Sequence, residues 1–504
     1  MALDIQAGDH VGIWSTNRPE WVQVQFATAS IGTPLVNINP AYRSHELEYV
    51  LRQADITTLV LLDRFKSSHY LEILKKICPE LEVCAPGSLE SARLPNLKRV
   101  IGITESVTPG VLLWRDFLAQ SGSVSTKALK LRRDHTQPAD VVNIQYTSGT
   151  TGFPKGVQLT HRNLLMNAFH VGQRMELCPD DRLCVPVPFY HCFGCVLGTL
   201  VSFLHGTSMV VPAEAFDIKA TLRSIAEERC TAIYGVPAMF IAELNEPSFQ
   251  EFDLTSLRTG IMAGSPCPVE VMQRVVIEMN AEEITIAYGL TEASPVVTQT
   301  WPHDTIEHRV KTIGTPLPGL DVKIIDPETG NELPPGQQGE LVVKGHGVMK
   351  GYYKLPEETA RAITPDHWLH TGDLGTRSED GYFNITGRIK DMIIRGGENI
   401  YPREIEEYLF NMPQIQNVQV IGLPDKKFGE VVSAWIILKK GHKLTEEQVK
   451  DFCRDSISYF KIPHYVVFVD AYPMTITGKT QKYKLRKMGI QRFGLDKEAE
   501  TETA

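Results

Sequence analysis

One short stretch restricts the fold of this chain more than any other. Residues Tyr146–Gly156 read YTSGTTGFPKG, in which hydroxyl side chains and glycines alternate before Lys155. Glycine lets a backbone turn tightly and approach a ligand, and successive N–H groups form an anion-binding hollow. The apolar run VVNIQY before the loop predicts a buried strand, and HRNLLMNAFHVGQRM after it predicts a helix. A strand, a glycine-rich loop and a helix in this order predict a phosphate-binding site.

The candidate phosphate-binding residues are Thr147, Ser148, Gly149, Thr150, Thr151, Gly152 and Lys155. Spacing excludes two familiar phosphate loops. No Gly precedes Lys155 and no Ser or Thr follows it, so the stretch is not a Walker A loop. It also lacks the GxGxxG pattern of dinucleotide-binding folds. The alternative is a surface loop that is rich in Thr and Gly and binds nothing.

Composition limits the class of protein. A chain of 504 residues with 42% hydrophobic and 22% charged residues predicts a globular protein of two or more domains. No apolar run is long enough to span a bilayer. The nine scattered cysteines predict no disulfide framework and favour a reducing compartment. Cys192 and Cys195 form an isolated C-x-x-C, which we interpret as apolar pocket wall rather than a metal or redox site.

The net charge of −9 argues against a broad nucleic-acid-binding surface. The charge is unevenly distributed along the chain. Residues 388–504 carry 19 Lys and Arg against 16 Asp and Glu, whereas residues 1–387 carry 32 against 44. A basic C-terminal part would suit a polyanionic ligand, although solvated surface charge is the simpler explanation.

Strand-like and helix-like segments alternate along most of the chain, for example VGIW with PEWVQVQFATASIG and TGIMAG with PVEVMQRVVIEM. This alternation predicts an α/β fold of mostly parallel sheets covered by helices. Residues 86–96 and 119–140 are expected to be polar connections. Residues 312–353, with DVKIID, GELVVKG and VMKGYY between Gly and Pro turns, predict a small β-rich subdomain.

After Gly387 the pattern changes to that of a small α+β domain. REIEEYLF predicts a helix, VQVIGLP and VVSAWIILKK predict strands, and Thr445 and Gln448 form a capping pattern before a further helix. The predicted domains are therefore residues 1–387 and 388–495. The remaining residues, 496–504, are polar and are expected to be disordered.

The segment YGLTEAS follows a predicted strand, ITIA, and places Thr291 and Glu292 at the end of that strand. Open α/β sheets bind ligands at this edge, and a carboxylate there can hold Mg²⁺ that bridges phosphates. The alternative is a helix N-terminus that carries a Glu favoured by the helix dipole.

Five more candidates lie in four separate segments. WLHTGDLG presents Asp373 between two turns, where a carboxylate can accept both hydroxyls of a ribose. Arg388 and Lys390 lie at the predicted domain junction, and Lys479 lies on a Gly-bearing turn whose many lysines otherwise read as a basic surface run. PFYHCFG places His191 among aromatic residues, where a structural core histidine is the alternative.

These motifs, in this order, resemble those of the adenylate-forming superfamily of acyl-CoA synthetases, luciferases and peptide-synthetase adenylation domains. The resemblance covers nearly the whole chain. Flanking segments such as NPAYRSHELEYVL, MAGSPCP and TITGKTQKYKLRK are most similar to the medium-chain acyl-CoA synthetases known as acyl-CoA synthetase family member 2. The resemblance implies a large AMP-binding domain that is followed by a smaller, mobile C-terminal domain.

The resemblance implies a ligase that uses ATP, Mg²⁺ and coenzyme A. A medium-chain fatty acid would attack the α-phosphate of ATP to give acyl-AMP and pyrophosphate, and the thiol of coenzyme A would then give acyl-CoA and AMP. The expected partners are these small molecules alone, without nucleic acid or a transmembrane segment. The sequence does not indicate an oligomeric state or a preferred chain length.

The nucleotide-binding roles come from the resemblance. Thr147–Lys155 would hold the β- and γ-phosphates, Glu292 would bind Mg²⁺, and Thr291 would contact the α-phosphate. The residues expected to border the adenine are Gly264, Ser265, Pro266 and Tyr288.

The remaining roles are implied in the same way. Asp373 would bind the ribose hydroxyls, with Arg388 beside it. Lys479 would bridge the α-phosphate and the attacking carboxylate, and His191 would lie near that carboxylate. Lys390 would be the hinge about which the small domain rotates between the two steps.

Three alternatives stay open: an aryl-acid or other carboxylic-acid–CoA ligase, a catalytically silent nucleotide-binding protein, and a peptide-synthetase adenylation module. Relatives carry a longer N-terminal part before the position of Leu3, so this chain matches a short form in which we expect the motifs for activity but reduced stability or impaired catalysis. The resemblance implies the mitochondrial matrix. MALDIQAGDHVGIW has no transit-peptide pattern, so a chain that truly begins there would be cytoplasmic.

Overall fold

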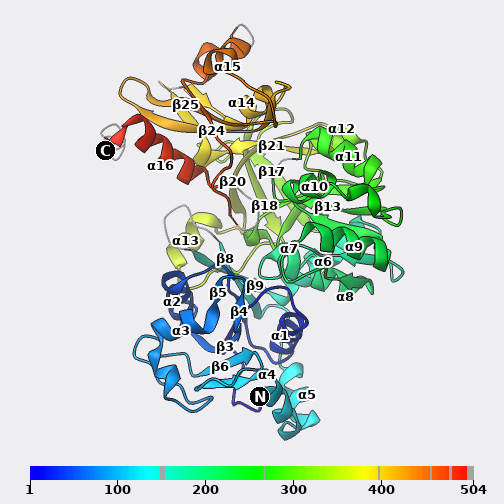
Figure 1. Ribbon diagram of the computed structural model, residues 1–504, viewed down its shortest axis with the longest axis vertical. Helices are drawn as coiled ribbons and strands as arrows, with labels where there is room; N and C mark the ends of the chain where they lie inside the picture. The colour runs from blue at the N-terminus through cyan, green and yellow to red at the C-terminus, as the bar shows by residue number, and fades with distance from the viewer. Residues whose placement is uncertain (148–153, 266, 396–397, 455–456, 476–479, 497–504) are drawn as a thin grey trace. The chain divides into compact units, whose positions relative to one another are not determined.

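The computed structural model has an α/β fold with a large N-terminal part and a smaller C-terminal part (Figure 1), as predicted. It describes residues 1–147, 154–265, 267–395, 398–454, 457–475 and 480–496. The chain forms two compact units, here called unit 1 (residues 1–322 and 343–370) and unit 2 (residues 323–342 and 371–504). The domain boundaries after residues 387 and 495 stay predictions, and the tail from residue 497 lies outside the described residues.

Unit 1 contains an eight-stranded sheet in the order β19-β9-β8-β2-β1-β3-β6-β7. Strands β1, β2, β3, β6 and β8 pair in parallel, which suits their nearly continuous apolar sequences. The strands are β1 His10–Trp14, β2 Leu35–Asn37, β3 Ile56–Leu62, β6 Arg99–Ile103, β7 Val111–Leu113, β8 Val141–Thr147, β9 Lys155–Thr160 and β19 Gly351–Tyr352. A separate hairpin joins β4 Arg64–Phe65 and β5 Ser68–His69.

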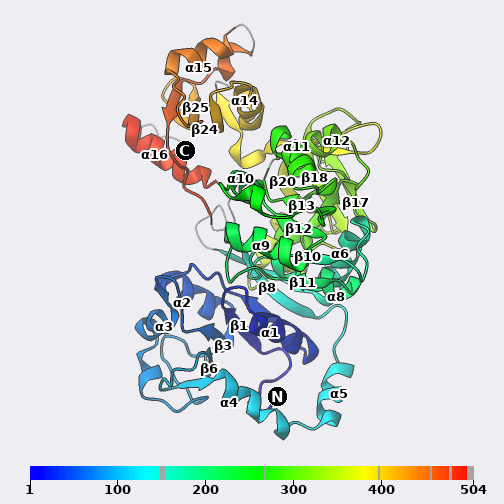
Figure 2. The same ribbon diagram turned by 45° about the vertical axis from the view of Figure 1, so that its right-hand side comes forward.

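A seven-stranded sheet completes unit 1 in the order β11-β10-β12-β13-β14-β15-β16. Its first five strands pair in parallel, and β15 and β16 are antiparallel. The strands are β10 Arg182–Cys184, β11 Ser208–Val210, β12 Ala232–Gly235, β13 Thr259–Ala263, β14 Glu283–Gly289, β15 Val296–Gln299 and β16 Thr315–Pro316. Helices α9 and α10 lie across strands β10, β12 and β13 (Figure 2), as expected for alternating strands and helices.

The α-helices of unit 1 follow most of the predicted positions. They are α1 Pro19–Ser30, α2 Ser44–Gln53, α3 Tyr70–Ile77, α4 Trp114–Ala119, α5 Thr126–Asp134, α6 His161–Arg174, α7 Cys192–Cys195, α8 Thr199–His205, α9 Ile218–Glu228, α10 Pro237–Leu244, α11 Val269–Glu278, α12 Ile306–Lys311 and α13 Pro356–Ala362.

Most of a four-stranded sheet belongs to unit 2, in the order β17-β18-β20-β21, with β17 Leu320–Ile325, β18 Gly339–Gly345, β20 Leu369–Arg377 and β21 Phe383–Arg388. A second sheet contains β22 Ile393–Arg395, β23 Glu398–Ile400, β24 Ile415–Asp425, β25 Gly429–Leu438 and β26 Tyr465–Phe468. Helices α14 Pro402–Leu409, α15 Glu446–Cys453 and α16 Lys482–Phe493 accompany it. The predicted capping of α15 by Thr445 and Gln448 is confirmed.

Three local predictions differ from the structure. The helix predicted from His161 is confirmed as α6, but it does not follow the glycine-rich loop directly, because Lys155–Thr160 forms strand β9 antiparallel to β8. The alternation of Val157 and Leu159 with polar residues was the missed signal. Residues 126–134 form helix α5 within the predicted connection 119–140. The segment VMKGYY contributes β19 to the eight-stranded sheet rather than to a β-rich subdomain, because Gly351 and Tyr352 pair with β9. No described helix has the length and apolar character needed to cross a bilayer.

Glu243 is a charged residue in the core beneath the seven-stranded sheet. It lies on α10, only 1% exposed, among residues such as Phe240 and Leu244. Neither carboxyl oxygen has a hydrogen-bond partner among the described residues. Burial without a partner penalises the charged form, and it raises the pKa of Glu243 from 4.5 to about 8.

We predict that Glu243→Gln stabilises the protein at alkaline pH. With a folded pKa above the unfolded pKa, the wild-type carboxyl loses stability as pH rises from about 4.5 to about 8. The free-energy gain of the variant should be near zero at pH 5 and a few kcal/mol at pH 8. Thermal unfolding at both pH values measures it, with the exposed Glu227→Gln as the control. A gain of equal size at pH 5 and pH 8 would contradict the assignment.

Candidate functional site

Several predicted residues lie at one edge of the seven-stranded sheet. Strands β10, β13 and β14 run parallel, so their carboxyl ends meet at the same edge. His191 follows β10, Gly264 follows β13, and Tyr288 lies near the end of β14. Ala263 pairs directly with Ala287, so Gly264 and Tyr288 end neighbouring strands. The structure therefore brings residues far apart in the sequence to the edge at which open α/β sheets bind ligands.

The backbone explains the glycine after β13. Gly264 has φ +91°, which L side chains rarely adopt, and an added Cβ would lie 3.2 Å from Val236 Cγ1. Ser265 beside it is exposed and Tyr288 is half-buried. Pro266 lies outside the described residues. The three described candidates leave an accessible rim where a flat ring could stack.

Glu292 is held in place by the strand that returns beside the glycine-rich loop. It lies in a single 3₁₀ turn, Thr291–Ala293, directly after β14. Its Oε1 accepts a hydrogen bond from Tyr352 Oη at 2.9 Å, and its backbone oxygen accepts one from Met349 N at 2.9 Å. Its Oε2 has no hydrogen-bond partner among the described residues. One carboxylate oxygen is thus fixed and the other is available.

This donor set fits Mg²⁺ bound together with nucleotide phosphates. Mg²⁺ is usually held by one or two carboxylates, with phosphate oxygens and water completing the coordination. Glu292 supplies one such carboxylate, and the described residues contain no group of three or more His, Cys, Asp or Glu that would form a self-sufficient metal site. A metal here would depend on a phosphate ligand.

The loop containing His191 lies against the turn that carries Thr291. His191 is half-buried and is the N-cap of α7, where its Nδ1 accepts a hydrogen bond from Phe193 N at 3.2 Å. Cys192 Sγ lies 4.0 Å from Thr291 Oγ1. Cys192 and Cys195 are both buried, which fits their interpretation as pocket wall.

The base of the glycine-rich loop is firmly built. Thr147 and Lys155 face each other as the last pair of the β8–β9 hairpin, and Tyr49 Oη donates to Pro154 O at 3.0 Å. The candidates Ser148, Gly149, Thr150, Thr151 and Gly152 lie outside the described residues.

Lys155 is held by two contacts that the sequence did not indicate. Its Nζ forms an ion pair with Glu358 of α13 and lies 5.1 Å from the centre of the Tyr352 ring. The lysine side chain is only 18% exposed. Tyr352 thus contacts both Lys155 and Glu292, and its burial, reinforced by the Glu292 charge, strongly raises the pKa of its phenol. The phenol therefore stays a hydrogen-bond donor at any physiological pH.

Unit 2 carries the predicted ribose carboxylate. Asp373 lies within strand β20, not between two turns as predicted, and it faces Arg388 across the β20–β21 pair. Asp373 is 3% exposed, and its Oδ1 is 2.7 Å from Arg388 Nε. Arg388 thus compensates the charge of the buried Asp373 carboxylate. A buried carboxylate needs such a partner if it is to serve as a fixed hydrogen-bond acceptor.

The segment before Asp373 is also fixed by hydrogen bonds. Thr371 Oγ1 donates to Leu341 O at 2.6 Å and accepts from Asp373 N at 3.1 Å. Glu340, 6% exposed, accepts from Gly372 N at 3.0 Å. These contacts keep the Asp373 backbone in one position.

The roles of two further residues, Lys390 and Lys479, are not decided by the described structure. Lys390 lies in a short 3₁₀ helix, Ile389–Asp391, directly after β21. Lys479 lies outside the described residues. Their roles stay predictions.

Sequence reasoning missed Tyr352, Glu358 and Glu340. Tyr352 lies in the segment 312–353 that was predicted to form a β-rich subdomain, and Glu358 lies just after it on α13, so neither was expected beside the loop. Gly351 inside the run VMKGYY was the available signal, because a glycine within a strand often marks a close backbone approach. In the structure its φ is +146°.

Comparison with known proteins identifies the family. Residues 1–353 match the AMP-binding enzymes, and residues 404–479 match the AMP-binding enzyme C-terminal domain. YngI of Bacillus subtilis, a proposed acyl-CoA synthetase, is 50% identical over 98% of this chain and 90% of its own length. The mitochondrial medium-chain acyl-CoA ligase ACSF2 of Danio rerio is 44% identical over 98% of this chain and 82% of its own.

Solved structures agree with the predicted fold. The anthranilate CoA ligase AuaEII in complex with anthranoyl-AMP has a TM-score of 0.85 at 26% identity, over 98% of this chain and 89% of its own. ATP-bound MatB from Rhodopseudomonas palustris has a TM-score of 0.80 at 29% identity, over 97% of this chain and 90% of its own. The predicted resemblance is confirmed. The chain belongs to the AMP-binding enzyme family and, within it, to the acyl-CoA synthetases, which are CoA ligases.

Proposed function

We propose that this CoA ligase activates medium-chain fatty acids through an acyl-AMP intermediate, with the balance fatty acid + ATP + CoA → acyl-CoA + AMP + pyrophosphate. The observation that carries the proposal is the Glu292–Tyr352–Lys155 contact, because it places a free carboxylate oxygen and a cation at the base of the glycine-rich loop. Identity of 42–44% to animal medium-chain acyl-CoA ligases supports the choice of acid.

The chemistry demands compensating positive charge. A carboxylate that approaches ATP meets a Coulomb repulsion on the order of 1–4 kcal/mol per charge pair at about 4 Å. A carboxylate is also a poor electrophile until its oxygen becomes part of a good leaving group, which AMP provides. The proposed site therefore needs preorganised cations where the two anions meet.

The proposal assigns roles on unit 1 as follows. The loop Thr147–Lys155 holds the β- and γ-phosphates, and Thr291 contacts the α-phosphate. Glu292 holds Mg²⁺, which when bound neutralises phosphate charge. His191 lies beside the acid, and the adenine is bordered by Gly264, Ser265, Pro266 and Tyr288.

On unit 2, Asp373 accepts the ribose hydroxyls while the ion pair with Arg388 holds its side chain in place. Lys479 bridges the α-phosphate and the attacking carboxylate. Lys390 is the hinge whose rotation exchanges the adenylation and thioester-forming arrangements. The acyl chain is proposed to lie along β12 and β13, where Ala232–Gly235 is fully buried. The ACSF2 relatives are named as mitochondrial, and the mitochondrial matrix is the proposed compartment of this chain.

The decisive experiment measures ATP-dependent pyrophosphate release with a series of straight-chain acids, with and without CoA. We expect the highest kcat/KM near octanoate and acyl-CoA formation only when CoA is present. A preference for hydroxycinnamate would favour the alternative of an aryl-acid–CoA ligase. Absence of pyrophosphate release with every acid would favour the catalytically silent alternative.

We predict that Lys479→Ala lowers pyrophosphate release by roughly 10²–10³-fold, because it removes one positioned charge from the transition state. Thioester formation from supplied acyl-AMP and CoA should stay close to wild type, since that step does not join two anions. Measuring both half-reactions on one preparation distinguishes a specific role of Lys479 in adenylation from a folding defect. Equal losses in both would contradict it.

We predict that Tyr352→Phe raises the KM for Mg·ATP about tenfold, because partners that orient a metal ligand affect metal affinity by 10–100-fold. The matched control is Tyr353→Phe, whose hydroxyl donates to Asp55 Oδ2 at 2.7 Å instead. Pyrophosphate release at saturating acid and varied Mg·ATP provides the measurement. An unchanged KM would show that Glu292 needs no orienting partner.

A further inference from the structure

Helix α5 is an exposed helix with an unusual composition. Its nine residues read TKALKLRRD, and none of them is buried. The helix is nevertheless held in place: Ser125 Oγ accepts from Ala128 N at 3.2 Å. The Arg132 guanidinium donates to Ile31 O at 3.3 Å and to Ile5 O at 3.4 Å. Its inner face is therefore fixed on unit 1, and its outer face is free.

The outer face combines cations with an exposed leucine. Leu131, whose exposure is 60%, lies one helical turn after Lys127. Lys127, Lys130 and Arg133 follow one another at intervals of three residues, so they lie along one side of the helix. Asp134 neutralises one of them, through an ion pair of 2.6 Å with Lys130. Lys127 and Arg133 have no ion-pair partner among the residues that the structure describes.

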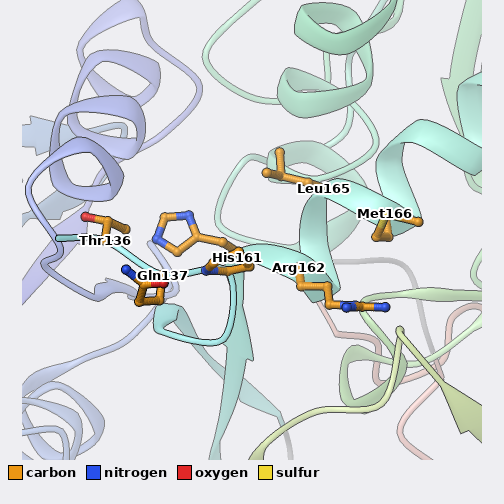
Figure 3. Close-up of a pocket in the computed structure, with 7 residues that line it drawn as sticks. Thr136, Gln137, His161, Arg162, Leu165 and Met166 are labelled. Carbon is orange, nitrogen blue, oxygen red and sulfur yellow. The ribbon is translucent and has the colours of Figure 1, made fainter. Parts of the chain in front are cut away.

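Exposed apolar surface continues before and after α5. Leu118 of the preceding helix α4 is 49% exposed, and α4 and α5 lie at the same end of unit 1 (Figures 1 and 2). After α5 the chain borders a pocket of about 540 Å³ whose lining surface is mainly apolar. Figure 3 shows the His161 ring between the turn at Thr136 and Gln137 and the first turn of α6. Arg162 and Leu165 of α6 also line the pocket. The exposed fraction of Leu165 is 40%.

The positive charge and the exposed apolar side chains together indicate which kind of partner binds the outer face of α5. The chain has a net charge of −9, so the three cations on one short face are a local exception and attract a negatively charged surface. A nucleic acid would form ion pairs with the cations but would give the exposed leucines no apolar environment. A bilayer with anionic headgroups interacts favourably with the cations and with the leucines, because basic residues bind the headgroups while apolar side chains enter the boundary of the acyl chains.

We propose that α5, with Leu118 and the pocket beside α6, docks unit 1 on the surface of anionic phospholipid bilayers. Lys127, Lys130 and Arg133 contact headgroup phosphates, and Leu118 and Leu131 enter the interface. The pocket gives room to one headgroup and the top of its acyl chain. The docking does not depend on which acid the enzyme activates, although it would bring the enzyme to a phase in which apolar acids concentrate.

The test is co-sedimentation of the full chain with phosphatidylcholine vesicles that contain or lack phosphatidylglycerol. We expect binding to the anionic vesicles, weakened by salt. The variant Lys127→Glu/Lys130→Glu/Arg133→Glu should lower the partition coefficient at least tenfold, because each basic residue near the surface contributes to attraction. Leu131→Asp should also weaken binding while leaving two-thirds or more of the CoA-ligase activity on a soluble acid.

The matched control carries the same change of charge on unit 2: Lys426→Glu/Lys440→Glu/Lys443→Glu, three exposed lysines. Binding that falls equally in this control would overturn the proposal, since net charge alone would explain it. Absence of binding to anionic vesicles would also overturn it. So would equally strong binding of soluble glycerophosphoglycerol, or self-association that is lost in the α5 variant without any vesicle binding.

Discussion

The hydrogen bond from Tyr352 to Glu292 joins the two large sheets of unit 1. Tyr352 belongs to β19, the edge strand of the eight-stranded sheet, and Glu292 follows β14 of the seven-stranded sheet. The backbone bond from Met349 N to Glu292 O and the bond from Ser294 Oγ to Gly347 O, at 2.6 Å, reinforce the same junction. The position of the candidate metal-binding carboxylate therefore depends on the packing of two sheets rather than on its own loop.

This junction also explains why a buried polar network is retained. Asn163 donates to His346 O at 2.6 Å and to Val348 O at 3.0 Å from the first turn of α6. Asn167, fully buried, donates to Val296 O at 2.7 Å. Each of these bonds satisfies a backbone group that would otherwise be costly to bury. Helix α6 thus fixes the segment before β19 and strand β15, and through them both sides of Glu292.

The sequence predicted the architecture well because the parallel strands are buried on both faces and read as apolar runs. VGIW, TGIMAG and TAIYGV became strands where expected. The position of Thr291 and Glu292 after the carboxyl end of β14 follows from the apolar run before them. By contrast, the contacts of Lys155 with Tyr352 and Glu358 join positions about 200 residues apart, and no local pattern encodes such a pairing. Strand β9 was missed because its first two residues were read as the end of the loop and residues 157–160 were assigned to no element.

The ion pair between Lys155 and Glu358 has a consequence for the proposed binding of nucleotide phosphates. A lysine with 18% exposure would pay a desolvation penalty if it had no counter-ion. Glu358 supplies that counter-ion, and Arg361 of the same helix contacts Glu358 Oε1 at 2.9 Å. A phosphate that binds Lys155 must compete with the Glu358 carboxylate, and Arg361 remains as a partner for the carboxylate after release. In the proposed function this exchange replaces one anion by another around the same ammonium group, so the net change in desolvation is small.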